Sequence, residues 1–263
     1  MADDMTSPVA YRRLARPSWQ TGFGPYLLVE SMPWLFLAMT MRTIAVTQPT
    51  PVAWLLFIGT QFVLLVAFSI ASGRMIAIAG GITMLRSLSM REQWLLSWAV
   101  VWRTFVVGMI ANYIARRAGM NVNEAGQLVF GFDGVAFNRH FDVMLLWSPV
   151  VASLAFLMVV EKGMGRRATL RGSLRSLLKR WRHMLAAVLI IIPCVFFLNL
   201  LQRFVGPGVG RFVNGFLPDR LIVFAVICFL FVFAFARLWL TVALLTYALR
   251  RSYREAGGDE PEQ

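Results

Sequence analysis

The sequence is poor in acidic residues, cysteine and histidine. Aspartate and glutamate number 13 against 26 lysines and arginines, and the 263 residues include 2 cysteines and 2 histidines. Cys194 and Cys228 both fall inside apolar runs and form no C-x-x-C motif, so the chain has no disulfide framework. We expect both to be small hydrophobic side chains within the core.

Catalytic motifs are also missing. The chain has no G-x-S-x-G, no H-E-x-x-H, no Walker loop and no dinucleotide-binding fingerprint. Asp133, His140 and Asp142 lie in the segment 115–142, but their spacing matches no metal-ligand motif, and a folded outer loop is expected there. The lack of a cluster of acids and histidines argues against an integral-membrane enzyme. No catalytic residue, metal site or cofactor is predicted.

Long apolar runs are what the chain has in excess. Its hydrophobic fraction is 58% and its mean hydropathy +0.65, whereas soluble chains are about 45–50% apolar. Uncharged runs of this length are typical of a bilayer protein. No secretory signal peptide is expected, because residues 1–24 are charged and no A-x-A-like cleavage site follows the first apolar run.

The apolar runs predict an all-α polytopic membrane domain over residues 25–249. A helix needs roughly 20 residues to cross the hydrocarbon, and the runs are about this length or longer. Glu30 and Pro33 interrupt the first run, which therefore allows a broken or re-entrant helix. Gly206-Pro207-Gly208 is interpreted as a turn in an outer loop. The six predicted spans are 25–44, 52–72, 94–114, 143–160, 184–201 and 221–249.

The distribution of basic residues predicts the orientation. Seventeen lysines and arginines fall in the segments 1–24, 72–93, 161–183 and 250–263. Seven fall in the loops predicted on the opposite side, 42–51, 115–142 and 202–220. Because basic residues mark cytoplasmic loops, both ends are predicted inside. This reading also explains the net charge of +13 without nucleic acid as a partner. The preference for arginine over lysine is typical of a GC-rich bacterial genome, which indicates a bacterial inner-membrane protein.

The segment 166–183 predicts a basic amphipathic helix lying in the headgroup plane. Neither Ala168 nor Thr169 predicts a strong cap, and Gly172 is the only interior residue that weakens the helix. His183 is expected to contact headgroups. The arginines would bind anionic lipid or a protein partner, or would act only as a topology signal. The apolar stripe is Leu170, Leu174, Leu177, Leu178 and Trp181, and the candidate binding residues are Arg167, Arg171, Arg175, Lys179, Arg182 and Trp181.

Three charges fall inside predicted spans: Glu30, Arg103 and Arg237. A charge at mid-bilayer costs at least about 2.5–3.5 kcal/mol on insertion scales, so these side chains should face the bundle interior or a wet cavity. One interpretation is a polar path for a substrate or proton. The other is that Glu30 pairs with one of the arginines and holds two helices together.

Two stretches carry a family resemblance. One runs from Val159-Val160-Glu161-Lys162-Gly163 through Ala168–Arg175 to Lys179-Arg180-Trp181, and the other runs from Tyr247-Ala248-Leu249-Arg250-Arg251 to Glu255–Asp259. Together they resemble the bacterial six-helix glycerophosphoryl diester phosphodiesterase membrane domain. The chain departs from that family in the Glu-Ala-Gly-Gly-Asp tail and in the spacing after Lys162. The resemblance implies an inner-membrane protein. It does not imply phosphodiesterase chemistry, which would need a separate soluble domain.

Two functions are compatible with these observations. The favoured one is a non-enzymatic scaffold or accessory subunit that engages anionic lipid or a protein partner through 166–183. The alternative is a transporter or permease-like protein with a polar interior around Glu30, Arg103 and Arg237. The two would be told apart by whether the intramembrane charges converge on one wet cavity.

Overall fold

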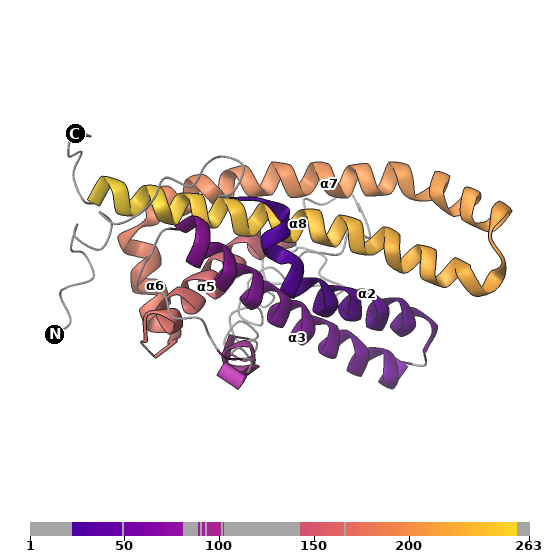
Figure 1. Ribbon diagram of the computed structural model, residues 1–263, viewed down its shortest axis with the longest axis horizontal. Helices are drawn as coiled ribbons and strands as arrows, with labels where there is room; N and C mark the ends of the chain where they lie inside the picture. The colour runs from indigo at the N-terminus through magenta and orange to yellow at the C-terminus, as the bar shows by residue number, and fades with distance from the viewer. Residues whose placement is uncertain are drawn as a thin grey trace.

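The computed structural model describes residues 23–48, 50–80, 89, 91–92, 94–100, 102, 143–165 and 167–256. Every regular element in these ranges is a helix, which confirms the all-α class (Figure 1). In chain order the elements are the 3-10 helix η3 (Pro25–Ser31), α2 (Met32–Thr47), α3 (Thr50–Met75), the π-helix η4 (Ile76–Gly80), α5 (Val143–Gly163), α6 (Leu170–Lys179), α7 (Trp181–Phe216) and α8 (Asp219–Ala256).

Three helical segments of the described chain are long and apolar enough to cross a membrane: Gly59–Ala79, Trp181–Phe216 and Leu221–Tyr253. At 1.5 Å per residue, the 36 residues of α7 and the 38 of α8 extend about 54 and about 57 Å. The hydrocarbon core of a bilayer is about 30 Å thick. Both helices must therefore tilt or project from the membrane. The membrane class is supported, whereas six spans and their orientation stay predictions.

The predicted outer loop 202–220 is wrong. Helix α7 continues to Phe216, so Gly206-Pro207-Gly208 lies inside a helix and is not a turn. Turns of this composition use glycine at positive φ, but among the described residues the glycine with positive φ is Gly165. Gly206 instead faces α8, where an added Cβ would come within 3.9 Å of Phe229. The chain reverses only at Leu217 and Pro218, between α7 and α8.

The interruption of the first span is a change of helix type. Residues Pro25–Ser31 form the 3-10 helix η3, and the α-helix α2 begins at Met32. Pro33 falls in the first turn of α2, where its missing N–H removes no helical hydrogen bond. The Ser31 hydroxyl donates to the Leu28 carbonyl at 2.6 Å and satisfies one acceptor at this junction.

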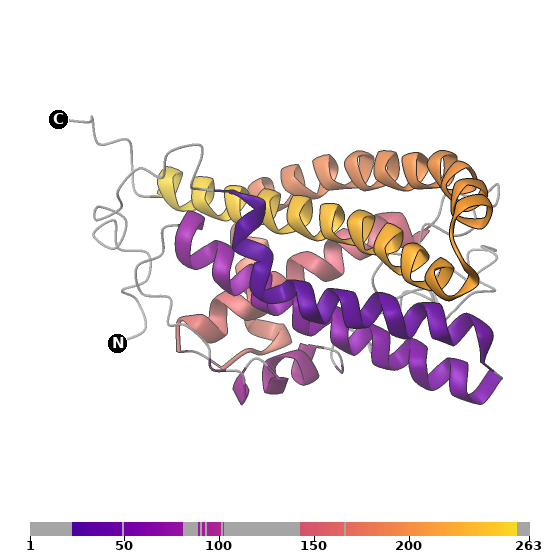
Figure 2. The ribbon, with the colours of Figure 1, turned by 45° about the vertical axis from the view of Figure 1, so that its right-hand side comes forward.

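Helix α8 lies between α7 on one side and α2 on the other (Figures 1 and 2). It packs against α2, α3, α5, α7 and η4, as the two views in Figures 1 and 2 show for its neighbours α2 and α7. The Trp239 indole N–H donates to the Phe23 carbonyl at 2.7 Å, which attaches the start of the described chain to α8. The most buried hydrophobic side chains of α8 are Ala234, Leu238, Val242, Leu245 and Leu249.

Small residues allow α3 and α5 to approach closely. Gly73 of α3 faces Val159 of α5, and a Cβ built on Gly73 would lie 3.9 Å from that side chain. Ala71 of α3 and Ala155 of α5 are also buried. Without a hydrophobic force between helices in lipid, such small side chains favour association by letting the backbones come together.

A capping box precedes the described part of the third predicted span. The Ser89 hydroxyl accepts from the Glu92 backbone N–H at 3.3 Å, and Glu92 Oε2 accepts from the Ser89 backbone N–H at 3.0 Å. This reciprocal pattern starts a helix, and residues 94–100 are helical. Residues 1–22, Arg103 and the predicted loop 115–142 lie outside the described residues, as does most of the remainder of this span.

The helix bundle has two ends that differ in the elements they contain. Figures 1 and 2 show α6 and the carboxyl end of α8 at one end of the bundle. The α2–α3 connection and the α7–α8 turn lie at the opposite end in both views. The basic helix is therefore separated from both hairpin turns along the bundle axis.

Candidate functional site

The candidate site is built on the turn between α5 and α6. After α5 ends at Gly163, the Gly165 N–H donates to the Lys162 carbonyl at 3.0 Å. Gly165 has φ of 75°, a left-handed conformation that glycine adopts without steric cost. This turn lets the chain reverse within a few residues and places α6 against α5.

The amino end of α6 has a side-chain cap. The Thr169 Oγ1 accepts from the Gly172 backbone N–H at 3.1 Å, and Thr169 has the extended backbone typical of an N-cap. The expectation of no strong cap was wrong. A Cβ at Gly172 would lie 2.9 Å from that hydroxyl, so glycine at this position suits the capping contact.

One face of α6 packs against the protein. Ser173 is fully buried, and the Ser176 hydroxyl donates to Glu161 Oε1 at 2.8 Å. Glu161 stands near the end of α5 and is 7% exposed. Leu177 packs against the main hydrophobic core. These contacts fix the rotation of α6 about its own axis.

The opposite face of α6 points away from the protein. Leu174 is 47% exposed and Leu178 is 64% exposed. At 100° per residue, the two leucines lie between the buried serines and the basic residues. Among the described residues, no carboxylate forms an ion pair with the basic residues of this face. We call the exposed set the α6 surface: Arg171, Leu174, Arg175, Leu178 and Lys179.

The basic segment is not one continuous helix from 166 to 183, which corrects the prediction. Helix α6 ends at Lys179, and Arg180 (φ −115°, ψ 24°) breaks the helix before α7 begins at Trp181. Arg167 precedes α6 and is exposed, while Trp181 and Arg182 belong to α7. The Arg182 guanidinium lies 5.7 Å from the Trp181 ring centre. The single apolar stripe is consequently divided between two helices.

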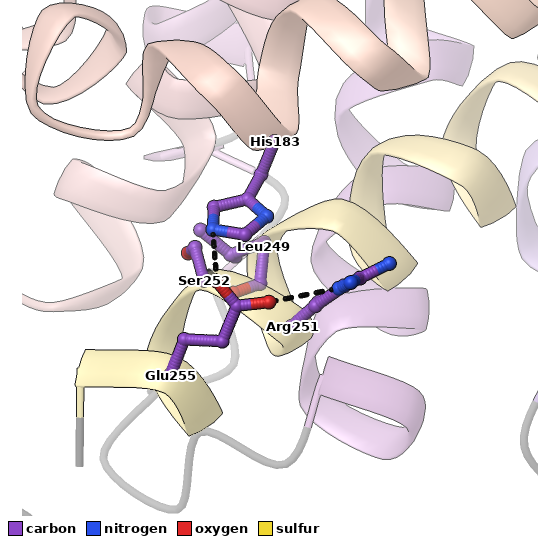
Figure 3. A network of polar contacts seen from close by, with 5 residues as sticks. All are labelled: His183, Leu249, Arg251, Ser252 and Glu255. Carbon is purple, nitrogen blue, oxygen red and sulfur yellow. Dashed lines mark hydrogen bonds and ion pairs between the residues drawn. The ribbon is translucent and has the colours of Figure 1, made fainter. Parts of the chain in front are cut away.

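A polar network joins the amino end of α7 to the carboxyl end of α8 (Figure 3). His183 Nε2 lies 3.1 Å from Glu255 Oε2, and Arg251 Nε donates to Glu255 Oε1 at 2.9 Å. The Arg180 guanidinium stacks 4.6 Å from the centre of the Tyr253 ring. His183, expected to contact headgroups, thus contacts a carboxylate of the same chain. The hydrogen bond from Arg251 lowers the pKa of Glu255, and the charges of His183 and Arg251 act in the same direction.

Glu30 does not pair with Arg237. Its Oε1 lies 3.8 Å from the Nε of Arg74, and both side chains are more than half exposed. An exposed pair of this length contributes little to stability. Of the two pairings expected for Glu30 inside the bundle, the one with Arg237 is therefore wrong, and the Glu30 side chain is exposed. The position of Arg103 lies outside the described residues.

Arg237 is buried at the middle of α8. It is 1% exposed and stands midway along the candidate span Leu221–Tyr253. Its Nη2 donates to Oε1 of Gln202 on α7. Asn199, one turn before Gln202, is 8% exposed, and its Oδ1 has no hydrogen-bond partner among the described residues. The structure places Arg237 in the bundle interior, with Gln202 bonded to it and the buried Asn199 one turn away on α7.

Sequence reasoning missed Glu161, Gln202 and Glu255. Gln202 was missed because it was placed in a loop; a longer fifth helix would have put it one turn from Asn199. Glu161 and Glu255 follow long apolar runs, where a carboxylate is conspicuous in a chain with 13 acidic residues. Their partners, Ser176 and His183, come from other helices and leave no local signal.

No protein family model, no curated protein and no solved structure matches this chain. Within the described residues, no group of three or more His, Cys, Asp and Glu side chains is arranged to hold a metal ion.

We predict that the hydrogen bond between Arg237 and Gln202 stabilises the packing of α7 against α8. Gln202→Leu removes the acceptor of a buried guanidinium and should lower the free energy of unfolding by about 1.5–3 kcal/mol. Gln202→Glu keeps an acceptor and adds an opposite charge, so it should restore or exceed wild-type stability. Thermal unfolding of the purified chain in mild detergent measures both. Equal stability of Gln202→Leu and wild type would show that this contact is dispensable.

The polar network around Glu255 predicts that the stability of the fold depends on pH. Because the pKa of Glu255 is lowered in the fold, its stabilising contribution is present above the ordinary value of 4.5 and is lost as the pH falls through the folded pKa. Glu255→Gln should therefore lower the unfolding temperature at pH 7, and its effect should be smaller at a pH well below 4.5. Arg211→Gln, an exposed arginine at the far end of α7, is the control. A Glu255→Gln effect of the same size at both pH values contradicts the assignment.

Proposed function

We propose that this chain is a non-enzymatic multi-pass membrane protein that binds anionic phospholipid through the α6 surface and serves as a scaffold or accessory subunit. The supporting observation is the division of α6 into three faces. Serines and Leu177 face the protein, Leu174 and Leu178 are exposed beside them, and the basic residues follow. A helix held at a bilayer interface needs this order: protein contact, acyl-chain contact and headgroup contact.

The energetics favour anionic lipid at this surface. Each lysine or arginine close to an anionic leaflet contributes about 1 kcal/mol, and the α6 surface holds Arg171, Arg175 and Lys179 unpaired with any described carboxylate. Arg167 and Arg182 are exposed on either side and would extend the same field. Burial of the two leucines in acyl chains adds a hydrophobic contribution that salt does not screen.

The separation of the bundle ends supports the proposed orientation. The α6 helix and the end of α8 lie at one end (Figure 1), and the segments that contain them, 161–183 and 250–263, hold eleven of the 26 basic residues. By the positive-inside rule that end is cytoplasmic, with both chain ends inside and the α7–α8 turn outside. A bacterial inner membrane is the proposed location, as the resemblance to the phosphodiesterase membrane-domain family also implies.

Arg237 favours transport as a second candidate function. The guanidinium of Arg237 is buried midway along α8, with Gln202 bonded to it and Asn199 one turn away. A buried guanidinium with neighbouring amides can bind an anionic group. Intramembrane ionisable residues commonly mark substrate paths. Glu30 no longer belongs to this path, because it is exposed beside Arg74. The lipid proposal is favoured because the α6 surface is already open to its ligand.

Cysteine labelling tests the orientation. In a Cys194→Ser, Cys228→Ser background, Lys179→Cys should resist an impermeant thiol reagent in intact cells, because α6 is placed on the cytoplasmic side. Gly215→Cys, exposed beside the α7–α8 turn, should be labelled. Permeabilised cells provide the control, where both positions should react. The reverse pattern in intact cells would invert the proposed topology.

Lipid selectivity tests the function. The full chain is reconstituted with spin-labelled phosphatidylglycerol or phosphatidylcholine, and the lipid bound at the protein is measured by electron paramagnetic resonance. Arg171→Gln with Arg175→Gln should reduce the preference for phosphatidylglycerol by about five-fold per arginine. High salt should reduce the wild-type preference as well.

The matched control removes two exposed arginines elsewhere. Arg203→Gln with Arg211→Gln changes the net charge equally but alters the other end of α7. If both double variants lose selectivity equally, the effect is general electrostatics and the α6 surface is not a lipid site. Unchanged selectivity, combined with loss of a co-purifying protein in the α6 variant, would point to a protein partner.

A further inference from the structure

The basic residues of the α6 surface form one evenly spaced row. Arg171, Arg175 and Lys179 follow one another at four-residue intervals and are all exposed. Along an α-helix this interval corresponds to about 6 Å of rise and a small rotation. Neighbouring members of the row can therefore approach the same ligand, whereas Arg171 and Lys179 are separated by about 12 Å along the axis.

We infer that this row recognises a phospholipid with two phosphodiesters on one headgroup, of the cardiolipin type, in preference to lipids with one phosphate. The inference rests on the proposed function and specifies its ligand. A glycerol bridge joins the two phosphates of such a lipid and keeps them close. Each phosphate can then meet one of two basic side chains a single helical turn apart.

The advantage over single-phosphate lipids comes from the covalent connection between the two phosphates. Two molecules of phosphatidylglycerol would each lose freedom on binding to adjacent arginines. For a two-phosphate lipid the second contact is intramolecular, so it forms at a high effective concentration. Arginine suits the contact because its guanidinium donates two parallel hydrogen bonds to phosphate oxygens.

The apolar part of the surface suits the chains of the same lipid. Leu174 and Leu178 are exposed between the basic row and the protein, and Trp181 and Leu185 at the start of α7 are 52% and 47% exposed. Acyl chains that descend from a headgroup on the row would cover these side chains. Competing carboxylates are engaged elsewhere: Glu161 accepts from Ser176, and Glu255 pairs with Arg251 and His183.

The chain offers a matched pair of variants for the test. Arg175→Gln removes the middle of the row and leaves the remaining two basic residues two turns apart. Lys179→Gln removes the same charge from the same surface but leaves Arg171 and Arg175 adjacent. Both positions are exposed, and neither forms an ion pair with a carboxylate of the described residues. Neither change should therefore affect folding, which thermal unfolding of each variant checks.

Native mass spectrometry of the full chain in mild detergent measures binding of cardiolipin, phosphatidylglycerol and phosphatidylcholine. Wild type and Lys179→Gln should bind cardiolipin about ten-fold more tightly than phosphatidylglycerol. Arg175→Gln should lose that ratio while binding phosphatidylglycerol as Lys179→Gln does. Equal binding of the two anionic lipids per phosphate, or an equal loss in both variants, overturns the inference but leaves the proposed function intact. Binding of all three lipids with one affinity overturns both.

Discussion

Lipid offers no hydrogen-bond partner to a polar group, so a polar side chain within a membrane bundle is stabilised by a partner on its own helix or on a neighbouring segment. Helix α8 meets this requirement at three levels. Arg237 donates to Gln202 of α7, Trp239 donates to the Phe23 carbonyl, and Arg250 donates to the Ala79 carbonyl of η4 at 3.4 Å. These contacts tie α8 to three different parts of the chain. The surrounding apolar packing is non-directional, so the polar contacts are what select one arrangement of the helices around α8.

The same requirement separates the charges of this protein into two groups. Glu161 and Glu255 accept hydrogen bonds from other helices, and they hold α6 to α5 and α7 to α8. Arg171, Arg175 and Lys179 face outward with no described carboxylate beside them. Glu161 therefore fixes the position of α6, and the basic residues of the second group are the ones that α6 exposes. The proposed lipid-binding surface therefore depends on a carboxylate, Glu161, that lies outside it.

The two largest corrections have one physical origin. Glycine and proline were interpreted as a turn at residues 206–208, and Glu30 was placed in the interior, because both readings judged a residue by its sequence neighbours. In α7 the helix is continued beside α8, with Gly206 near Phe229. In η3 the tighter helix turns Glu30 toward Arg74. Neither neighbour is close in sequence, and each decides the outcome through a contact that local composition does not contain.

The amino-acid sequence by itself determined the all-α class, the membrane character and the position of the basic segment. Hydrophobicity, charge and helical period are local properties, and they reach the same values whatever the helices pack against. Tertiary structure decided where α6 ends, which way it faces and which residues hold it there. The break at Arg180 accompanies its stacking on Tyr253, and the rotation of α6 follows from Ser176 meeting Glu161. These are contacts between helices, and their free energy exists only once the bundle has formed.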